Sequence, residues 1–243
     1  MSETLFEMSS DSLPEWAKRI AVFDTETTGL DLAEARIVTA CVAVLDENGQ
    51  LIAPARNWVA DPGIEIPEVA ANVHGYDTER ARREGRPTAE VIGEIVEHLR
   101  ELFAEGIAVV AYNAPYDFTI LYHEAKRNHI APIAEPFLVI DPLVLDKKLD
   151  WRKGKRKLEN TAEYYQVELI AAHTAEADAI AAGRVAQAIA RKYFNKLQMD
   201  RETLHKQQVA WSIEQDKSFA EFMRREVNPN FVETPGWPLK PVS

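Results

Sequence analysis

The chain has 243 residues, of which 46% are hydrophobic, so it can bury one substantial core with a small appendage. It contains no run of about 18 apolar residues, and the acidic segment Met1–Thr4 lacks the basic and apolar regions of a secretory signal, so we expect a cytoplasmic protein with no membrane partner. The net charge of −11 argues weakly against tight nonspecific binding of nucleic acid. Carboxylates that bind metal ions also contribute to this negative charge, so it does not argue against a metal-dependent nuclease.

Three strands are predicted near the N-terminal end. Arg19–Asp24 is a short apolar run that ends in turn-forming residues, and Arg36–Leu45 is rich in β-branched residues. Its single cysteine, Cys41, is expected to be buried and reduced. Asn48-Gly49 favours a hairpin turn, after which Leu51–Val59 should return as a third strand. These strands predict an antiparallel meander.

Helices and strands then alternate. Thr88–Phe103 has apolar residues at helical spacing after a Thr cap. The further elements are, in order, the strand Ile107–Tyr112, a helix around Phe118–Ala125, the strand Phe137–Ile140, the helices Leu158–Tyr165, Ala175–Phe194 and Arg201–Arg225, and the irregular tail Asn228–Ser243. We therefore predict an α/β fold with a mixed sheet of five strands flanked by helices, a core domain over residues 14–195, and a helical extension with an irregular tail over residues 196–243.

The first group of candidate functional residues lies at the end of the first strand. Asp24 and Glu26 are two residues apart, so their side chains project from the same face of a strand. Adjacent carboxylates repel each other unless a cation or a shared proton compensates them, and hard cations such as Mg²⁺ prefer oxygen ligands. The pair is a candidate metal site, although acids are common at strand ends.

The second group follows the strand Ile107–Tyr112. Asn113 is a plausible helix N-cap, and Pro115 fits the first helical turn. Asp117 then lies on the helix face that returns towards the strand end. By itself, Asp117 is as compatible with a favourable charge at the helix N-terminus as with a catalytic role.

The third group contains His173 and Asp178. Thr174 is a plausible N-cap, which leaves His173 in the preceding loop and Asp178 early in the helix. A histidine beside a fixed carboxylate suits a general base near a metal ligand, although a lone surface histidine is common.

Together, the three groups resemble the motifs of the proofreading-type (DnaQ-like, DEDDh) 3′–5′ exonuclease family. VFDTETTGL (22–30) resembles the first motif, AYNAPYDFTIL (111–121) the second and HTAEADA (173–179) the third, over roughly residues 18–190. The resemblance implies a ribonuclease H-like fold.

The resemblance also implies roles for the acids and the histidine. Asp24, Glu26 and Asp178 would hold the catalytic metal, and Asp24 would also touch a second ion that Asp117 helps to hold. Two Mg²⁺ or Mn²⁺ ions are therefore expected. His173 corresponds to the general base of the family.

Four further residues are expected to bind or order the terminal nucleotide, namely Thr27, Leu30, His74 and Asn113. Leu30 would pack on the terminal base, and His74 belongs to a Val-His-Gly segment that resembles the one beside this nucleotide in the family. Tyr76 and Tyr116 replace the aliphatic residue and the phenylalanine that are more usual at their positions.

The expected function is metal-dependent 3′–5′ hydrolysis of DNA, preferably single-stranded, with release of nucleoside 5′-monophosphates. Two alternatives stay open. The first is an RNA-trimming exonuclease of the same fold, and the second is a noncatalytic scaffold that binds nucleic acid or a polymerase. The expected partners are a DNA or RNA 3′ end and, as one candidate, a DNA polymerase. The sequence predicts no oligomeric state.

A basic run and a set of C-terminal aromatic residues also support predictions. The basic run Arg152–Lys157 is expected to contact phosphate rather than form only a solvated loop. The aromatic residues Trp211, Phe219 and Phe222 are expected to dock the C-terminal extension onto the core.

Overall fold

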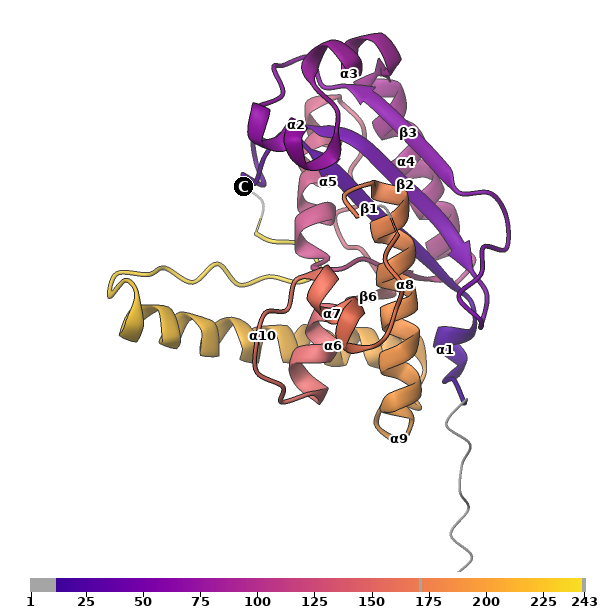
Figure 1. The fold of residues 1–243 in the computed structure, drawn as a ribbon, viewed down its shortest axis with the longest axis vertical. Helices are drawn as coiled ribbons and strands as arrows, with labels where there is room; N and C mark the ends of the chain where they lie inside the picture. Colours follow the sequence, from indigo (N-terminus) through magenta and orange to yellow (C-terminus); the bar gives the residue numbers. More distant parts are fainter. Residues whose placement is uncertain (1–11, 171, 242–243) are drawn as a thin grey trace, which may run out of the picture.

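The computed structural model describes residues 12–170 and 172–241 (Figure 1). Residues 1–4, on which the expectation of a cytoplasmic protein partly rests, lie outside this part, as do Val242 and Ser243 of the predicted tail. In the described part, no helix is both long enough and apolar enough to cross a bilayer.

Six strands form one mixed sheet in the order β4-β3-β2-β1-β5-β6. β1 pairs antiparallel with β2 and parallel with β5, so the sheet changes direction at its centre. The predicted mixed sheet is confirmed, with one strand more than the five expected, because β4 is too short to leave an alternating pattern in the sequence. The bounds are β1 (Ile20–Thr27), β2 (Ile37–Leu45), β3 (Arg56–Asp61), β4 (Arg86–Pro87), β5 (Ala108–Val110) and β6 (Val139–Ile140).

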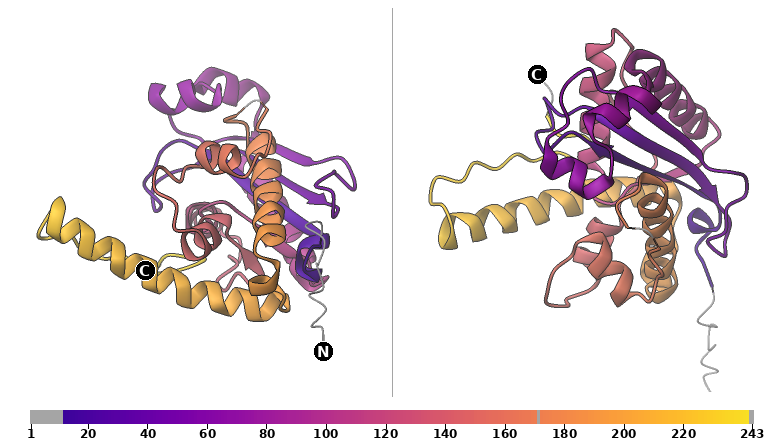
Figure 2. Two further views of the ribbon diagram at one scale, coloured as in Figure 1. Left: turned by 60° about the horizontal axis from the view of Figure 1, so that its bottom comes forward. Right: turned by 45° about the horizontal axis from the view of Figure 1, so that its top comes forward.

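Helices cover both faces of the sheet. In Figure 1, α4 and α5 lie behind the strands and α8 lies in front of them, and the two views of Figure 2 show the same layers. The bounds are α1 (Glu15–Lys18), α2 (Glu68–His74), α3 (Thr78–Glu84), α4 (Thr88–Ala104), α5 (Pro115–Arg127), α6 (Pro142–Leu149), α7 (Leu158–Tyr164), α8 (Ala175–Lys192), α9 (Phe194–Leu197) and α10 (Arg201–Glu226).

Successive side chains of β1 point to opposite faces of the sheet, so the strand contributes to two core layers. Phe23 packs with buried residues of α4 and α5, and Val22 packs on the opposite face with α8. Gly183 lets α8 approach closely, because a Cβ at this position would lie 2.5 Å from Val22 Cγ1 and 2.7 Å from Leu45 Cδ1. The central strand is therefore buried on both faces, which explains its continuous apolar sequence.

Two local predictions were wrong. The third strand begins at Arg56 rather than at Leu51, which forms only an isolated bridge with Leu45 after the hairpin turn. Thr88 does not cap α4, because it is the first helical residue and its hydroxyl donates to the Asp61 carbonyl. The N-cap position belongs to Pro87, which carries no capping side chain.

Five helices of the described part were not predicted from the sequence, namely α1, α2, α3, α6 and α9. Each has only four to eight residues, which is too short for a clear apolar period. α2 and α3 follow β3 and lie over one end of the sheet (Figure 1), and α6 follows β6.

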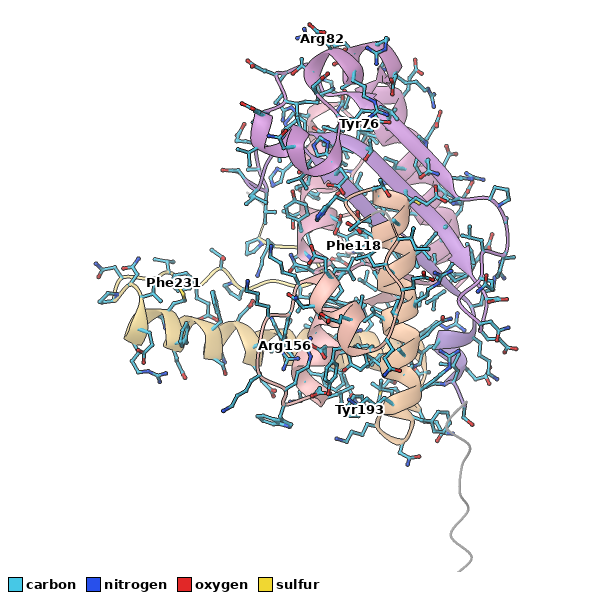
Figure 3. The ribbon with its side chains drawn as sticks, viewed as in Figure 1. Tyr76, Arg82, Phe118, Arg156, Tyr193 and Phe231 are labelled. Atoms are coloured by element: carbon cyan, nitrogen blue, oxygen red, sulfur yellow. The ribbon has the colours of Figure 1, made fainter. Side chains whose placement is uncertain are left out.

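The C-terminal extension is anchored by residues other than those expected. Trp211 packs against both core layers, but Phe219 and Phe222 are exposed, so their docking onto the core was predicted wrongly. Phe219 instead meets Phe231 of the returning tail, far from the sheet (Figure 3). Trp237 is the tail residue that enters the core. The domain boundary at residue 195 stays a prediction.

Candidate active site at the end of the central strand

Two acids of the site lie on β1. Asp24 and Glu26 are both half-buried, two residues apart, near the end of the strand, as predicted. Across the sheet from Asp24, Cys41 is fully buried in β2, and burial raises the pKa of its thiol to about 12. The predicted burial of Cys41 is confirmed, and a thiol with a raised pKa is a poor nucleophile.

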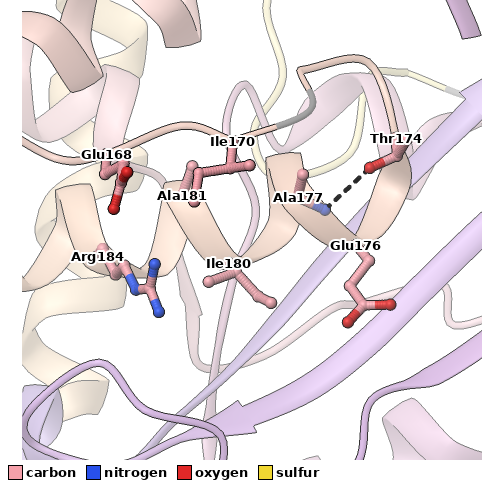
Figure 4. Close-up of a pocket in the computed structure, with 8 residues that line it drawn as sticks. All are labelled: Glu168, Ile170, Thr174, Glu176, Ala177, Ile180, Ala181 and Arg184. Carbon is pink, nitrogen blue, oxygen red and sulfur yellow. Dashed lines mark hydrogen bonds between the residues drawn. The ribbon is translucent and has the colours of Figure 1, made fainter.

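The third acid, Asp178, lies in the first turn of α8. The Thr174 hydroxyl accepts a hydrogen bond from the Ala177 N–H and caps this helix, as predicted (Figure 4). The Asp178 carboxylate accepts the backbone N–H of His173 at 3.3 and 3.4 Å. The positive end of the helix dipole favours a carboxylate at this position.

These three side chains converge. Asp24, Glu26 and Asp178 each offer one carboxylate oxygen, and the three oxygens all lie within 4.8 Å of one another. Oxygens bound to one Mg²⁺ at about 2.1 Å are separated by at most about 4.2 Å, so small side-chain movements would complete the coordination. The donor set thus fits a hard divalent cation.

Asp117 lies beside this group and is held by the first motif. Its Oδ1 accepts the Thr25 backbone N–H at 3.0 Å and the Thr25 hydroxyl at 2.7 Å. The charge of Asp117 is, after burial, the largest contribution to the raised pKa of Asp24. All four predicted acids therefore lie in one neighbourhood.

The electrostatics of this neighbourhood favour a bound cation. Burial raises the pKa of Glu26 to about 7, with a further contribution from Asp178. Burial also raises the pKa of Asp117 to about 7, although the two hydrogen bonds from Thr25 oppose the shift. The pKa values of Asp24 and Asp178 are raised as well, with burial as the main cause. Without a cation, these carboxyl groups compete to hold protons near neutral pH.

His173 lies in the loop before α8, as predicted, and its imidazole is partly exposed. Its backbone has a positive φ of 72°, which directs the N–H towards Asp178. The imidazole Nε2 lies 3.9 Å from Oε1 of Glu159, a residue of α7 that the sequence did not single out. Glu159 is therefore a charged neighbour of the imidazole.

The four predicted nucleotide-binding residues have different environments. Leu30 is 87% exposed just beyond β1, where it is free to pack on a ligand. Thr27 is buried, and its hydroxyl donates to the Gly29 carbonyl at 2.9 Å, which stabilises the turn before Leu30. His74 is buried, and its Nδ1 accepts the Tyr76 N–H at 3.2 Å. His74 and His173 both line a groove of about 360 Å³ along β2 and β3.

Asn113 does not cap α5, contrary to the prediction. It has a positive φ of 61°, which asparagine tolerates better than most residues, and Ala114 occupies the N-cap position. The backbone N–H groups of Asn113 and Ala114 donate to the two carboxylate oxygens of Asp141 at 2.9 and 3.0 Å. Asp141 thus takes over the ordering role that the sequence had assigned to an Asn113 cap.

Sequence reasoning missed Asp141 as a site residue. Its buried carboxylate also accepts the Leu143 N–H, which caps α6, and the Trp237 indole N–H at 3.1 Å. The sequence carried one signal, because an acid directly before a proline is typical of a helix start. Nothing in the sequence indicated the contact between Asp141 and Trp237, because the two residues lie far apart in the chain.

A cavity of about 300 Å³ runs along α8 from Thr174 to Arg184 (Figure 4). Its lining includes Ile170, Ile180 and Glu168, and the three converging carboxylates are not part of the lining described. The candidate site is the carboxylate group and not this cavity.

Several known proteins are similar to this chain. Residues 21–186 match the model of the exonuclease family called RNase_T. A DNA polymerase III of the PolC type from Lacticaseibacillus paracasei is 29% identical over 171 residues, which cover 70% of this chain and 11% of that protein. A DNA polymerase III subunit epsilon-like protein from Rhodobacter capsulatus is 36% identical over 122 residues, which cover 49% of this chain and 16% of that protein.

The fold is similar to that of solved exonucleases. Escherichia coli exonuclease I in complex with a dT13 oligonucleotide superimposes with a TM-score of 0.62 at 17% identity, over 74% of this chain and 43% of that one. Exonuclease I from Methylocaldum szegediense gives a TM-score of 0.62 at 23% identity, over 74% of this chain and 42% of that one. The chain spans about a tenth of the length of the PolC-type relatives and less than half of these structures.

Proposed function

This chain belongs to the DnaQ-like family of 3′–5′ exonucleases, and we propose that it removes nucleotides from the 3′ end of DNA, preferably single-stranded, and releases nucleoside 5′-monophosphates. The observation that carries the proposal is the convergence of Asp24, Glu26 and Asp178, whose oxygens lie within 4.8 Å of one another. Carboxylates that raise one another's pKa in this way are costly unless they bind a cation.

The proposed roles follow from the environment of each side chain. Asp24, Glu26 and Asp178 would hold one divalent cation, and Asp117, whose charge acts on Asp24, would help to hold a second. When bound, Mg²⁺ or Mn²⁺ would supply the positive charge that acidifies water and stabilises the charge developing on the scissile phosphate and its leaving oxygen. Thr25 keeps Asp117 in place through two hydrogen bonds.

His173 is proposed to accept the proton of the attacking water. Its imidazole is accessible in the loop before α8, and the Glu159 carboxylate lies 3.9 Å from Nε2. The exposed Leu30 packs on the terminal base, while the buried Thr27 supports the turn that carries it. His74 contributes a wall of the groove, and Asp141 holds the loop before Asp117 through the backbone N–H of Asn113.

The DNA preference and the partner are supported by the relatives. The polymerase names of the similar proteins favour a DNA 3′ end as substrate and a DNA polymerase as a partner. An exoribonuclease would use the same acids. Comparing DNA with RNA as substrates distinguishes this alternative from the proposal.

Digestion of a 5′-labelled single strand tests the proposal. We expect Mg²⁺-dependent shortening from the 3′ end, with nucleoside 5′-monophosphates as the product identified by chromatography. Asp24→Asn and Asp178→Asn keep the side-chain volume and remove a charged ligand, so each should lower the rate by at least about a thousandfold without unfolding the chain. Glu202→Gln, at an exposed acid in the first turn of α10, is the matched control and should keep full activity.

Undiminished digestion by either Asp variant would contradict the assigned site. Parallel reactions on single-stranded DNA, duplex DNA and RNA of one sequence distinguish the DNA exonuclease from an exoribonuclease. Binding without release of any mononucleotide would instead support the scaffold alternative.

A further inference from the structure

The loop that joins α6 to α7, called here the basic loop (residues 151–157), separates its charged side chains into two sets. Arg152 and Arg156 turn inward, where their side chains are only 10% and 17% exposed and both pair with the buried carboxylate of Asp146. Arg156 also donates to the carbonyls of Asp150 and Arg152 at 2.8 Å each. Figure 3 shows Arg156 beside α6 and α7. The two arginines therefore hold the loop in shape, and the expected phosphate contact does not fall to them.

The other set points outward. Lys153, Lys155 and Lys157 are exposed, and in the described part of the chain none of the three forms an ion pair. Trp151 is 93% exposed at the start of the same loop. The preceding acid, Asp150, is already occupied by Lys192 at 2.8 Å and by two tyrosine hydroxyls, so it does not neutralise these lysines.

The C-terminal end of the basic loop is tied to the candidate active site. Lys157 is the residue before α7, whose first turn carries Glu159, the neighbour of His173. The Tyr112 hydroxyl donates to the Arg156 carbonyl at 2.8 Å, and Tyr112 directly precedes Asn113. This end of the loop is therefore positioned by the same elements that position the general-base candidate and the second motif.

We propose that the basic loop binds a single-stranded nucleic acid upstream of the 3′-terminal nucleotide, with a base stacked on Trp151 and phosphates contacted by Lys153, Lys155 and Lys157. An exposed aromatic ring accepts any unstacked base, and lysines beside it follow the backbone, which is how many proteins bind single strands without reading sequence. A duplex offers no free base face to the ring. This inference rests on the proposed exonuclease function, because it assigns the path of the same substrate.

The test compares two substrates on the full-length chain. One is a single strand of about 20 nucleotides, long enough to reach the loop, and the other is the p-nitrophenyl ester of thymidine 5′-monophosphate, which fills only the site. The variants are Trp151→Ala, Trp151→Phe, and the triple variant in which Lys153, Lys155 and Lys157 become Gln. The matched control replaces three exposed lysines elsewhere, Lys126, Lys206 and Lys217, by Gln.

The expected result is selective for the long strand. Trp151→Ala should weaken binding of the strand, measured by fluorescence anisotropy in EDTA, by roughly tenfold, and Trp151→Phe should restore most of it. The triple lysine variant should reduce the slope of log K against log salt by about 2, since each phosphate contact on a single strand contributes about 0.7. All variants should hydrolyse the ester at the wild-type rate.

Several outcomes would overturn the inference. Unchanged binding in both loop variants, equal losses in the lysine control, or competition by polyglutamate as effective as by the oligonucleotide would each do so. Loss of ester hydrolysis together with strand binding would mean that the loop supports the fold of the site instead. If the wild-type chain hydrolyses neither substrate, the exonuclease proposal fails, while the anisotropy measurement still decides the role of the loop.

Discussion

Thr25 donates both its backbone N–H and its hydroxyl to one carboxylate oxygen of Asp117, at 3.0 and 2.7 Å. These two bonds connect β1 to the first turn of α5, so the position of one acidic motif depends on the other. Because Thr25 lies between Asp24 and Glu26, a change at Thr25 alters the site without removing a candidate ligand.

Thr25→Val should therefore lower the rate of nucleotide release by roughly tenfold, because a hydrogen bond to a charged group contributes about 1.5–3 kcal/mol and one of the two bonds remains. Thr25→Ser keeps the hydroxyl and should retain most of the activity. Steady-state kinetics on a single-stranded oligonucleotide measure both. Impairment in Ser with full activity in Val would show that the methyl group, not the hydroxyl, matters.

The raised pKa values predict how metal and pH act together. Glu26 and Asp117 have folded-state pKa values of about 7, above their ordinary values of 4.5 and 3.8. Between about pH 4 and about pH 7, these two groups bind more protons in the folded metal-free chain than in the unfolded chain. Their contribution to the free energy of unfolding should therefore fall as pH rises from about 4 to about 7. Metal ions must displace these protons, so Mn²⁺ should raise Tm more at about pH 8 than at about pH 5.5.

Differential scanning calorimetry with and without Mn²⁺ at both pH values checks this prediction. Asp24→Asn, which lacks one ligand charge, should show a smaller stabilisation by Mn²⁺ at the higher pH. A stabilisation that is independent of pH would contradict the assignment of these carboxyl groups as ligands.

His173 and Glu159 give a prediction about the general base. His173→Ala should lower turnover by about a hundredfold or more and leave Mn²⁺ affinity, measured by titration calorimetry, nearly unchanged. Glu159→Gln keeps the shape of the neighbour but not its charge, so turnover should fall severalfold with little change in KM. If His173→Ala weakens metal binding as much as turnover, the histidine is a ligand rather than a base.

Trp237 gives a prediction about the tail. Trp237→Phe removes the indole N–H donated to Asp141, whose carboxylate orders the loop before Asp117, and should slow turnover severalfold. The cost in stability should be about 1.5–3 kcal/mol, because the lost bond is to a carboxylate. Trp16→Phe removes a buried bond to a neutral group, from Trp16 to the Leu197 carbonyl at 3.0 Å, and should cost about 1 kcal/mol at no loss of turnover. An equal effect of the two variants on turnover would argue against a positioning role for the tail.

Two helical glycines should respond in opposite ways to substitution by alanine. At Gly183 the new Cβ would lie 2.5 Å from the stiff Val22 side chain, so overpacking should destabilise the chain by about 1–2 kcal/mol. At Gly93 in α4 the nearest atom lies 3.8 Å away, so the better helix propensity of alanine should stabilise the chain by up to about 1 kcal/mol. Urea denaturation measures both. Stabilisation by Gly183→Ala would show that α8 can move away from the sheet.

Local sequence patterns were sufficient for the central elements. The apolar run before Asp24 predicted β1, the helical period predicted α4 and α8, and Thr174 was recognised as a cap because capping depends on residues within one turn. The spacing of Asp24 and Glu26 placed both on one face of the strand. Short elements such as α2, α3 and β4 left too few residues for a period to be seen.

The sequence by itself determined which residue types stand at the strand end and at the two helix starts, since each of these depends on neighbours a few positions away. Only the tertiary structure decided that Asp141 would replace Asn113 in ordering the second motif, that Trp237 would reach that carboxylate, and that Arg152 and Arg156 would turn inward while their neighbouring lysines stay outside. These outcomes depend on burial and on partners distant in the chain, because a buried polar group must find a hydrogen bond wherever the fold provides one.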